Sequence, residues 1–204
     1  MASTSASDPA AFSALLNGHE GRAMRFDVVD DLESPEALLR GEVVLTEALT
    51  LKRDSGSQLR DLMGETFGVL RLVSERFVSL AREASLTGWC VYPVRLLDYA
   101  GAELGGYHGL AVTGRCGPID RSHSQLIARV SRDRTKKPLY AEIGLFFEME
   151  SWDGSDLFIP AGTSIVCLTE RAANVVSEGQ LTNVQLIPLA EYQLGLHADR
   201  PPKV

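Results

Sequence analysis

The chain carries one pattern twice, and this duplication constrains its fold more than any other feature. Residues 73–94 read VSERFVSLAREASLTGWCVYPV, and residues 168–189 read LTERAANVVSEGQLTNVQLIPL. The two align without a gap, and the identical pairs are Glu75/Glu170, Arg76/Arg171, Glu83/Glu178, Leu86/Leu181, Thr87/Thr182 and Pro93/Pro188. Such self-similarity indicates one supersecondary unit used twice.

Each copy has the pattern of a strand, a helix and a returning strand. Ser74 stands where an N-cap belongs, with Glu75 in the first turn, and Thr169 and Glu170 repeat this arrangement. Apolar or small residues then recur at helical spacing, at Phe77, Leu80, Ala81 and Ala84 and again at Ala172, Val175, Val176 and Gly179. The sequence therefore predicts an α+β fold, with two pseudo-equivalent strand–helix–strand units packed with antiparallel or mixed sheet.

The units also suggest the domain organisation. We expect a single α+β domain over residues 23–194, with the internal repeat at 69–97 and 164–192. Residues 1–22 are expected to be partly disordered, with one helical turn around Phe12 to Leu16, and the polar residues 195–204 to form a loose tail. Outside the repeat we expect strands within 24–29, 42–51, 107–113 and 139–149, helices at 34–40 and 124–130, and a polar loop at 52–57.

Composition limits the partners of the protein. A net charge of −7 argues against a nucleic-acid partner, because phosphate contacts need clustered Lys and Arg. No apolar run approaches the roughly 18 residues of a membrane span, and the N-terminus lacks the features of a secretory signal. Cys90, Cys116 and Cys167 are odd in number and widely spaced, which is typical of buried thiols in a reducing compartment. We expect a cytoplasmic protein with no membrane partner.

No catalytic, metal or cofactor site is predicted. His108, Cys116, Asp120 and His123 could supply metal ligands, but they lack the spacing of known zinc motifs, so ordinary loop polarity is favoured. Ser122 precedes His123, yet adjacency in sequence does not make a catalytic dyad. The glycines between residues 101 and 109 do not have the spacing of a phosphate-binding loop.

Two segments are candidates for binding a partner. In residues 152–156, WDGSD, either the residues form a tight turn or Trp152, Asp153 and Asp156 form a patch for a partner; the turn is favoured. The acidic segment comprises Asp27, Asp30, Asp31, Glu33 and Glu36. It is either a solvated face or, through Asp30, Asp31 and Glu33 above all, a surface that steers a basic partner.

Several short motifs occur in an order that resembles a bacterial family. They are VSERF at 73–77, YPV at 92–94, YH at 107–108, SWDGSDLF at 151–158, LTN at 181–183 and PL at 188–189. Together they resemble immunity protein family eleven, typified by a myxobacterial protein and found beside polymorphic toxins. The resemblance covers about Phe26 to Tyr192 and carries over no catalytic residues.

This resemblance implies a non-catalytic protein that binds and neutralises a cognate toxin in the producing cell or its kin. If the toxin acts on nucleic acid, its basic groove would suit the acidic segment as a phosphate mimic. Two alternatives stay open. One is a small-ligand or regulatory binding module with a groove between the repeats, lined by Arg76 and Arg171. The other is a weak hydrolase or transferase built on the loop from His108 to His123.

Overall fold

The computed structural model describes residues 8–18, 20–66, 68–129 and 139–197. It is mostly β, with 43% strand, 18% helix and a closed six-stranded barrel, so the predicted α+β fold is wrong. The strands are short, and some are buried along their whole length, as β4 and β5 are. Such strands do not show the alternation of apolar and polar residues that identifies a strand, and the two capped, periodic helices therefore dominated the prediction.

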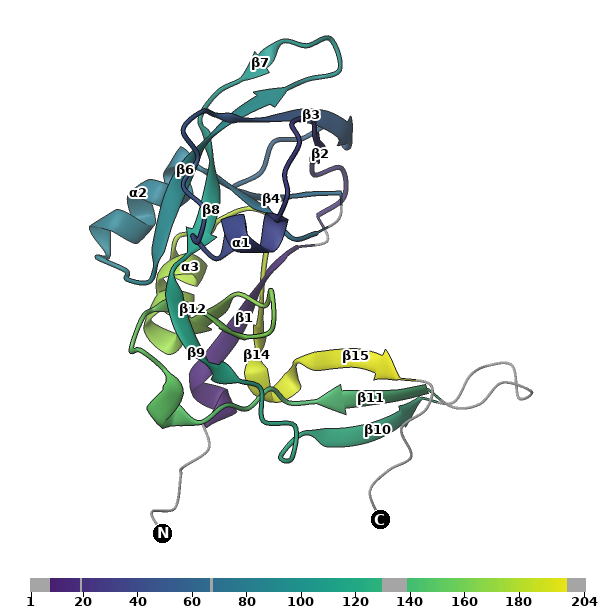
Figure 1. The fold of residues 1–204 in the computed structure, drawn as a ribbon, viewed down its shortest axis with the longest axis vertical. Coiled ribbons are helices and arrows are strands. Elements are labelled where there is room, and N and C mark those ends of the chain that lie inside the picture. The colour runs from purple at the N-terminus through teal and green to yellow at the C-terminus, as the bar shows by residue number, and fades with distance from the viewer. Residues whose placement is uncertain (1–7, 19, 67, 130–138, 198–204) are drawn as a thin grey trace, which may run out of the picture.

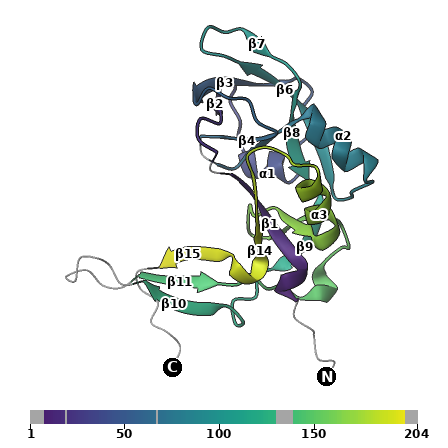
Figure 2. The ribbon, with the colours of Figure 1, turned by 180° about the vertical axis from the view of Figure 1, so that it is seen from behind.

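The elements follow one another along the chain as shown in Figure 1 and, from behind, in Figure 2. The helical elements are η1 (Pro9–Ala11), α1 (Pro35–Leu39), α2 (Glu75–Glu83), η2 (Met149–Ser151), α3 (Glu170–Glu178) and η3 (Leu189–Glu191). The strands are β1 (Phe12–Asn17), β2 (Arg25–Val28), β3 (Leu49–Ser55), β4 (Leu62–Glu65), β5 (Arg71–Ser74), β6 (Trp89–Leu97), β7 (Glu103–Leu104), β8 (Tyr107–Val112), β9 (Gly114–Pro118), β10 (Gln125–Arg129), β11 (Leu139–Ile143), β12 (Leu157–Ala161), β13 (Cys167–Thr169), β14 (Val184–Pro188) and β15 (Gln193–His197).

The first half of the molecule is the closed barrel. Its strands follow the order β3-β2-β4-β5-β8-β6, and pairing between β3 and β6 closes the ring. The pairs β2–β4 and β3–β6 are parallel, and the other neighbours are antiparallel. Phe26, Leu51, Met63 and Leu72 are fully buried in one core cluster of this half.

The second half repeats this order but does not close. Its sheet runs β9-β12-β13-β1-β14, with the same parallel and antiparallel senses as β2-β4-β5-β8-β6. No strand takes the place of β3 within the described residues. Instead, β10, β11 and β15 form a separate three-stranded sheet that projects to one side (Figure 1). The two halves are therefore related in topology but end differently.

Strand β1 shows how the halves interlock. β1 lies between β13 and β14, which are both near the C-terminal end of the chain. In the first half, β8 holds the same position between β5 and β6. The registers agree, because Thr169 pairs with Phe12 as Ser74 pairs with Tyr107. The helical turn predicted around Phe12 to Leu16 is thus wrong, and β1 is a central strand within the segment 1–22 that was expected to be partly disordered.

Three further local predictions are wrong, and three are confirmed. The expected helix at 124–130 is strand β10, and most of the expected loop at 52–57 belongs to β3. The strand expected within 42–51 is irregular connection from residue 42 to residue 48, because β3 begins only at Leu49. The N-caps Ser34, Ser74 and Thr169 are confirmed, since each side chain accepts a hydrogen bond from the backbone N–H three residues on. Residues 195–197 of the expected loose tail belong to β15, which pairs with β11, and residues 198–204 lie outside the described residues.

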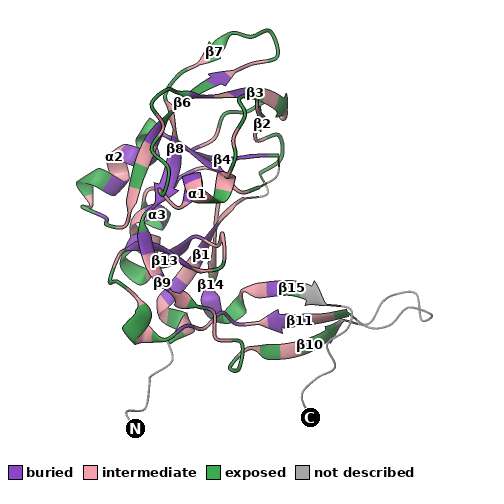
Figure 3. Cartoon of the chain, in the orientation of Figure 1, coloured by how far each residue is buried: buried purple, intermediate pink, exposed green. Residues whose placement is uncertain are grey.

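The two halves share the largest core cluster. Helices α2 and α3 lie side by side on one flank in both views (Figure 1, Figure 2). Phe77 and Val78 of α2, Ala172 and Val176 of α3, and Leu15 of β1 belong to the cluster between them. Figure 3 shows that buried residues continue through both halves. Among the described helices, none is long and apolar enough to span a membrane.

Candidate functional site

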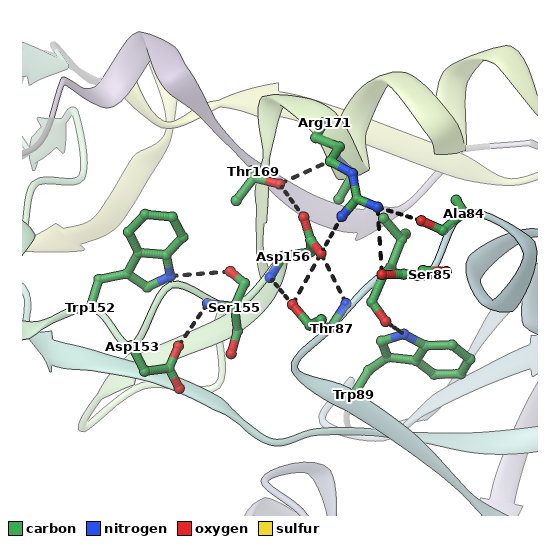
Figure 4. A network of polar contacts seen from close by, with 12 residues as sticks. Ala84, Ser85, Thr87, Trp89, Trp152, Asp153, Ser155, Asp156, Thr169 and Arg171 are labelled. Carbon is green, nitrogen blue, oxygen red and sulfur yellow. Dashed lines mark hydrogen bonds and ion pairs between the residues drawn. The ribbon is translucent and has the colours of Figure 1, made fainter.

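Asp156 is the centre of a hydrogen-bond network that joins the two halves (Figure 4). It lies just before β12 and is 7% exposed. Its Oδ2 accepts hydrogen bonds from Thr87 N at 2.9 Å, Thr87 Oγ1 at 3.0 Å and Arg171 Nη1 at 2.7 Å. Its Oδ1 accepts one from Thr169 Oγ1 at 3.1 Å. Because Thr87 belongs to the first half, this carboxylate connects the halves.

Asp61 forms the same network with the halves exchanged. Its Oδ2 accepts hydrogen bonds from Thr182 N and Thr182 Oγ1, both at 2.8 Å, and from Arg76 Nη1 at 3.3 Å. Its Oδ1 accepts one from Ser74 Oγ at 2.7 Å. Asp61 belongs to the first half and Thr182 to the second. Each half therefore supplies the carboxylate of one network and the threonine of the other.

Arg76 and Arg171 complete these networks by binding the end of the opposite helix. Arg76 Nη2 donates to the carbonyl of Gly179 at 2.6 Å, and Arg171 Nη2 donates to the carbonyl of Ala84. A cation at a helix C-terminus binds carbonyls that have no partner inside the helix. Both arginines were candidates for a ligand groove. The structure places each in an ion pair with an aspartate and against a helix end.

The electrostatics of the two carboxylates agree with this geometry. Burial opposes the ionisation of Asp61 and Asp156 and would raise their pKa values. Hydrogen bonds from the hydroxyl and backbone donors, together with the arginine in each network, outweigh burial. The pKa of each aspartate is consequently lower than its ordinary value, and both are ionised at neutral pH.

A hollow of about 290 Å³ lies between the two helices, but neither arginine lines it. Its walls come from matching positions of α2 and α3 and their ends, namely Leu80, Glu83, Ala84, Val175, Glu178 and Gly179. The predicted groove between the repeats therefore has walls other than Arg76 and Arg171.

The WDGSD segment forms a turn. Trp152 Nε1 donates to the carbonyl of Ser155 at 3.1 Å, and its ring packs edge-on against Phe12 with centroids 5.3 Å apart. Asp153 Oδ1 accepts a hydrogen bond from Ser155 N at 3.0 Å, and Gly154 has a φ of 84°. Trp152, Asp153 and Asp156 are thus engaged within the fold rather than gathered in a free patch for a partner.

The acidic segment, by contrast, is exposed along its course from β2 to the first turn of α1. All five carboxylate residues are exposed, including Asp30, Asp31 and Glu33. Asp30 Oδ2 accepts a hydrogen bond from Thr50 N at 2.6 Å. The other four side chains make no hydrogen bond or ion pair with any described residue. The segment therefore presents negative charge that the described part of the fold does not neutralise.

Exposed valines lie close to the acidic segment in the sequence and, in one case, in space. Val29 is 58% exposed, and its N–H bonds the carbonyl of Thr50, the residue that also binds Asp30. Val43 and Val44, in the connection from α1 to β3, are 42% and 89% exposed. Val29 thus places one exposed apolar side chain beside the carboxylates of the acidic segment.

The histidine loop does not have the geometry of a catalytic relay. His123 Nδ1 lies 2.8 Å from Asp120 Oδ2 and 3.2 Å from Ser122 Oγ. A Ser-His-Asp relay needs the acid and the nucleophile on opposite ring nitrogens, whereas here both share one. His108 is bound elsewhere, with its Nε2 2.6 Å from Glu75 Oε2. No group of three or more His, Cys, Asp or Glu among the described residues could hold a metal ion.

The cysteines are divided by their burial. Cys116 and Cys167 are buried, as expected, but Cys90 is exposed on β6. Burial raises the pKa of Cys116 to about 12 and that of Cys167 well above its ordinary value. Both buried thiols therefore stay protonated at neutral pH.

The sequence patterns did not indicate that Asp61, Thr87 and Thr182 take part in these hydrogen-bond networks. The duplicated segments begin after Asp61 and Asp156, so these residues were not part of the aligned pairs. A signal was nevertheless present, because each aspartate precedes the capping residue of its helix by 13 residues. Extending the alignment towards the N-terminus would have matched them.

Comparisons with known proteins give no family for the chain. No family model matches it, and no curated protein does so either. The resemblance to immunity protein family eleven therefore depends on the short motifs alone.

Proposed function

We propose that this protein binds and neutralises a cognate bacterial toxin inside the producing cell, without carrying out chemistry on it. The observation that supports the proposal best is the exposed acidic segment beside Val29. The order of motifs that resembles an immunity family supports it independently. The proposed partner is a protein with a basic face.

The chemistry of this surface suits a protein partner. Carboxylates that form no internal ion pair carry negative charge that no neighbouring cation neutralises. This charge attracts a basic surface and therefore speeds association with it. The exposed side chain of Val29 adds apolar area that can be buried on contact. Inhibition would follow from covering the active site of the toxin, or a site next to it.

The proposal is tested by measuring association of the protein with the product of the adjacent gene at several salt concentrations. The variant Asp31→Lys with Glu33→Lys reverses two charges that make no described contact. Asp30 is left unchanged, because its carboxylate binds Thr50 N. We expect association to slow by about tenfold at low salt and the difference to shrink as salt rises.

A matched control is available in the second half. Glu150 and Glu191 are exposed residues of η2 and η3, and neither side chain has a hydrogen bond or ion pair with a described residue. The variant Glu150→Lys with Glu191→Lys has the same net charge as the test variant, and it should associate nearly as fast as the wild type. Equal rates for the two variants would contradict the proposed role of the acidic segment.

A further inference from the structure

A second hollow, of about 250 Å³, lies between α3 and the end strand of its sheet, β14. Its lining comprises Val176 and Ser177 of α3, Gln180 and Leu181 of the turn that follows, and Val184 and Leu186 of β14. None of these residues lines the hollow between the two helices. The volume is smaller than the roughly 300–1,000 Å³ of typical small-molecule sites, so the hollow suits a single large side chain.

In the first half of the molecule, a tryptophan side chain occupies the matching place. Trp89 and Val184 hold the same position in the duplicated segments, as Leu86 and Leu181 do, and the strands that carry them pair in the same register. The indole Nε1 of Trp89 donates to the carbonyl of Leu86 at 2.8 Å (Figure 4). The indole therefore lies across the space that Leu181 and Val184 border in the second half. The smaller valine leaves that space open.

The second half also keeps the acceptor for such an indole. The turns that carry the two carbonyls share a residue of positive φ, which is Ser85 at 51° in one half and Gln180 at 48° in the other. No described residue donates a hydrogen bond to the carbonyl of Leu181. An indole placed as that of Trp89 is would supply the donor, because its N–H is its only polar group.

The free edge of β14 borders the same hollow. Leu15 of β1 faces β13, because its N–H donates to the carbonyl of Val166 at 2.8 Å. Its register partner Leu186 therefore directs its own N–H and C=O away from β1, and Val184, two residues earlier, does the same. On that side neither residue has a hydrogen bond with a described residue. Such an edge can pair with another strand.

We propose that an extended segment of a partner protein pairs with the free edge of β14 and places a tryptophan side chain in this hollow. Residues opposite each other on neighbouring strands project to the same face of a sheet, so a tryptophan opposite Val184 or Leu186 lies beside the lining side chains. Main-chain hydrogen bonds to the edge supply affinity, and the hollow selects the side chain. The proposal does not depend on toxin binding by the acidic segment.

Titration of the full chain with an N-acetylated, amidated pentapeptide, Thr-Val-Trp-Val-Thr, tests the proposal. We expect saturable shifts of the backbone amide signals of Val184 and Leu186 in nuclear magnetic resonance spectra of the isotope-labelled protein. The same peptide with alanine in place of tryptophan lacks the anchoring side chain, and it should bind about tenfold more weakly. N-acetyltryptophanamide has the indole but no strand, so it should also bind more weakly. A tryptophan peptide that causes no saturable shift, or that binds no more tightly than these two controls, would overturn the proposal.

A variant copied from the first half locates the site. Val184→Trp introduces the residue found at Trp89, and it should fill the hollow and abolish binding of the peptide. Val44→Trp makes the same substitution at a valine that is 89% exposed in the connection from α1 to β3, and it should leave binding unchanged. Melting temperatures measured alongside show whether each variant is folded. If Val184→Trp does not fold, Ser177→Trp covers the hollow from the exposed side of α3 and should weaken binding about tenfold. Peptide binding that survives in the folded variant would place the partner elsewhere.

Discussion

At the scale of residues, two aspartates hold the halves of the molecule together. Asp61 and Asp156 each bind a hydroxyl residue and an arginine from their own half and a threonine from the other. Charge-assisted hydrogen bonds of this kind are stronger than neutral ones. The arginines and threonines that the duplication repeats thus serve the same role in both halves, because they bind the aspartates that join the halves.

Replacing either carboxylate by an amide should therefore destabilise the protein. We expect Asp61→Asn and Asp156→Asn each to lower the free energy of unfolding by about 3 kcal/mol, because the arginine and hydroxyl donors lose a charged acceptor. Urea unfolding measures the change. Glu103→Gln, at an exposed ion pair with Arg95, should cost less than about 1 kcal/mol. Aspartate variants no more costly than this control would refute the structural importance of the networks.

The same two groups predict a dependence of stability on pH. Their pKa values are lower in the folded protein than the value of about 3.9 expected when unfolded. Their contribution is fully present above that value, and it is lost as the pH falls through the lower folded values. Urea unfolding measured from about pH 6 down to about pH 2 should show this loss. The double variant Asp61→Asn/Asp156→Asn should show a flatter profile; an unchanged profile would count against the assignment.

Residues with local partners could be predicted from the sequence, and those with distant partners could not. Ser74 and Thr169 cap helices through the backbone N–H three residues later, which is a local pattern. Asp61 binds Thr182, 121 residues away, and nothing near either residue indicates the other. Arg76 and Arg171 were candidates for lining a ligand groove, whereas each binds an aspartate 15 residues earlier and the end of the opposite helix.

At the scale of elements, the placement of β1 is the feature that sequence reasoning missed. Its six residues, FSALLN, do not alternate between apolar and polar, and its partners β13 and β14 lie near the other end of the chain. Helices α2 and α3 make their hydrogen bonds within themselves, so their periodicity and caps were visible. Strand pairing depends on distant segments, and its register could not be read locally.

The equivalence of β1 and β8 can be tested by truncating matching side chains. Leu15 of β1 and Leu110 of β8 are both fully buried in the cluster shared by the halves. We expect Leu15→Ala and Leu110→Ala each to lower the free energy of unfolding by about 3 kcal/mol through lost burial and a residual cavity. The control Leu59→Ala, at a residue that is 39% exposed, should cost less than about 1 kcal/mol. If Leu15→Ala resembled that control, β1 would not be a central strand.

At the scale of the whole molecule, a duplication has produced two halves that are no longer equivalent. The sequence indicated two related units, but it gave no sign that β3 pairs with β6 to close one barrel while the other half stays open. Ring closure is a property of the assembled sheet and not of any one strand. The barrel half also carries the exposed acidic segment.

The most direct test of the proposed function is rescue of growth. The product of the adjacent gene is expressed in a sensitive host with the wild-type protein, with Asp31→Lys/Glu33→Lys, or with Glu150→Lys/Glu191→Lys. The account predicts that the wild type and the second variant restore growth and co-purify with the toxin, and that the first variant protects less. A toxic product that the wild-type protein neither binds nor neutralises would contradict it.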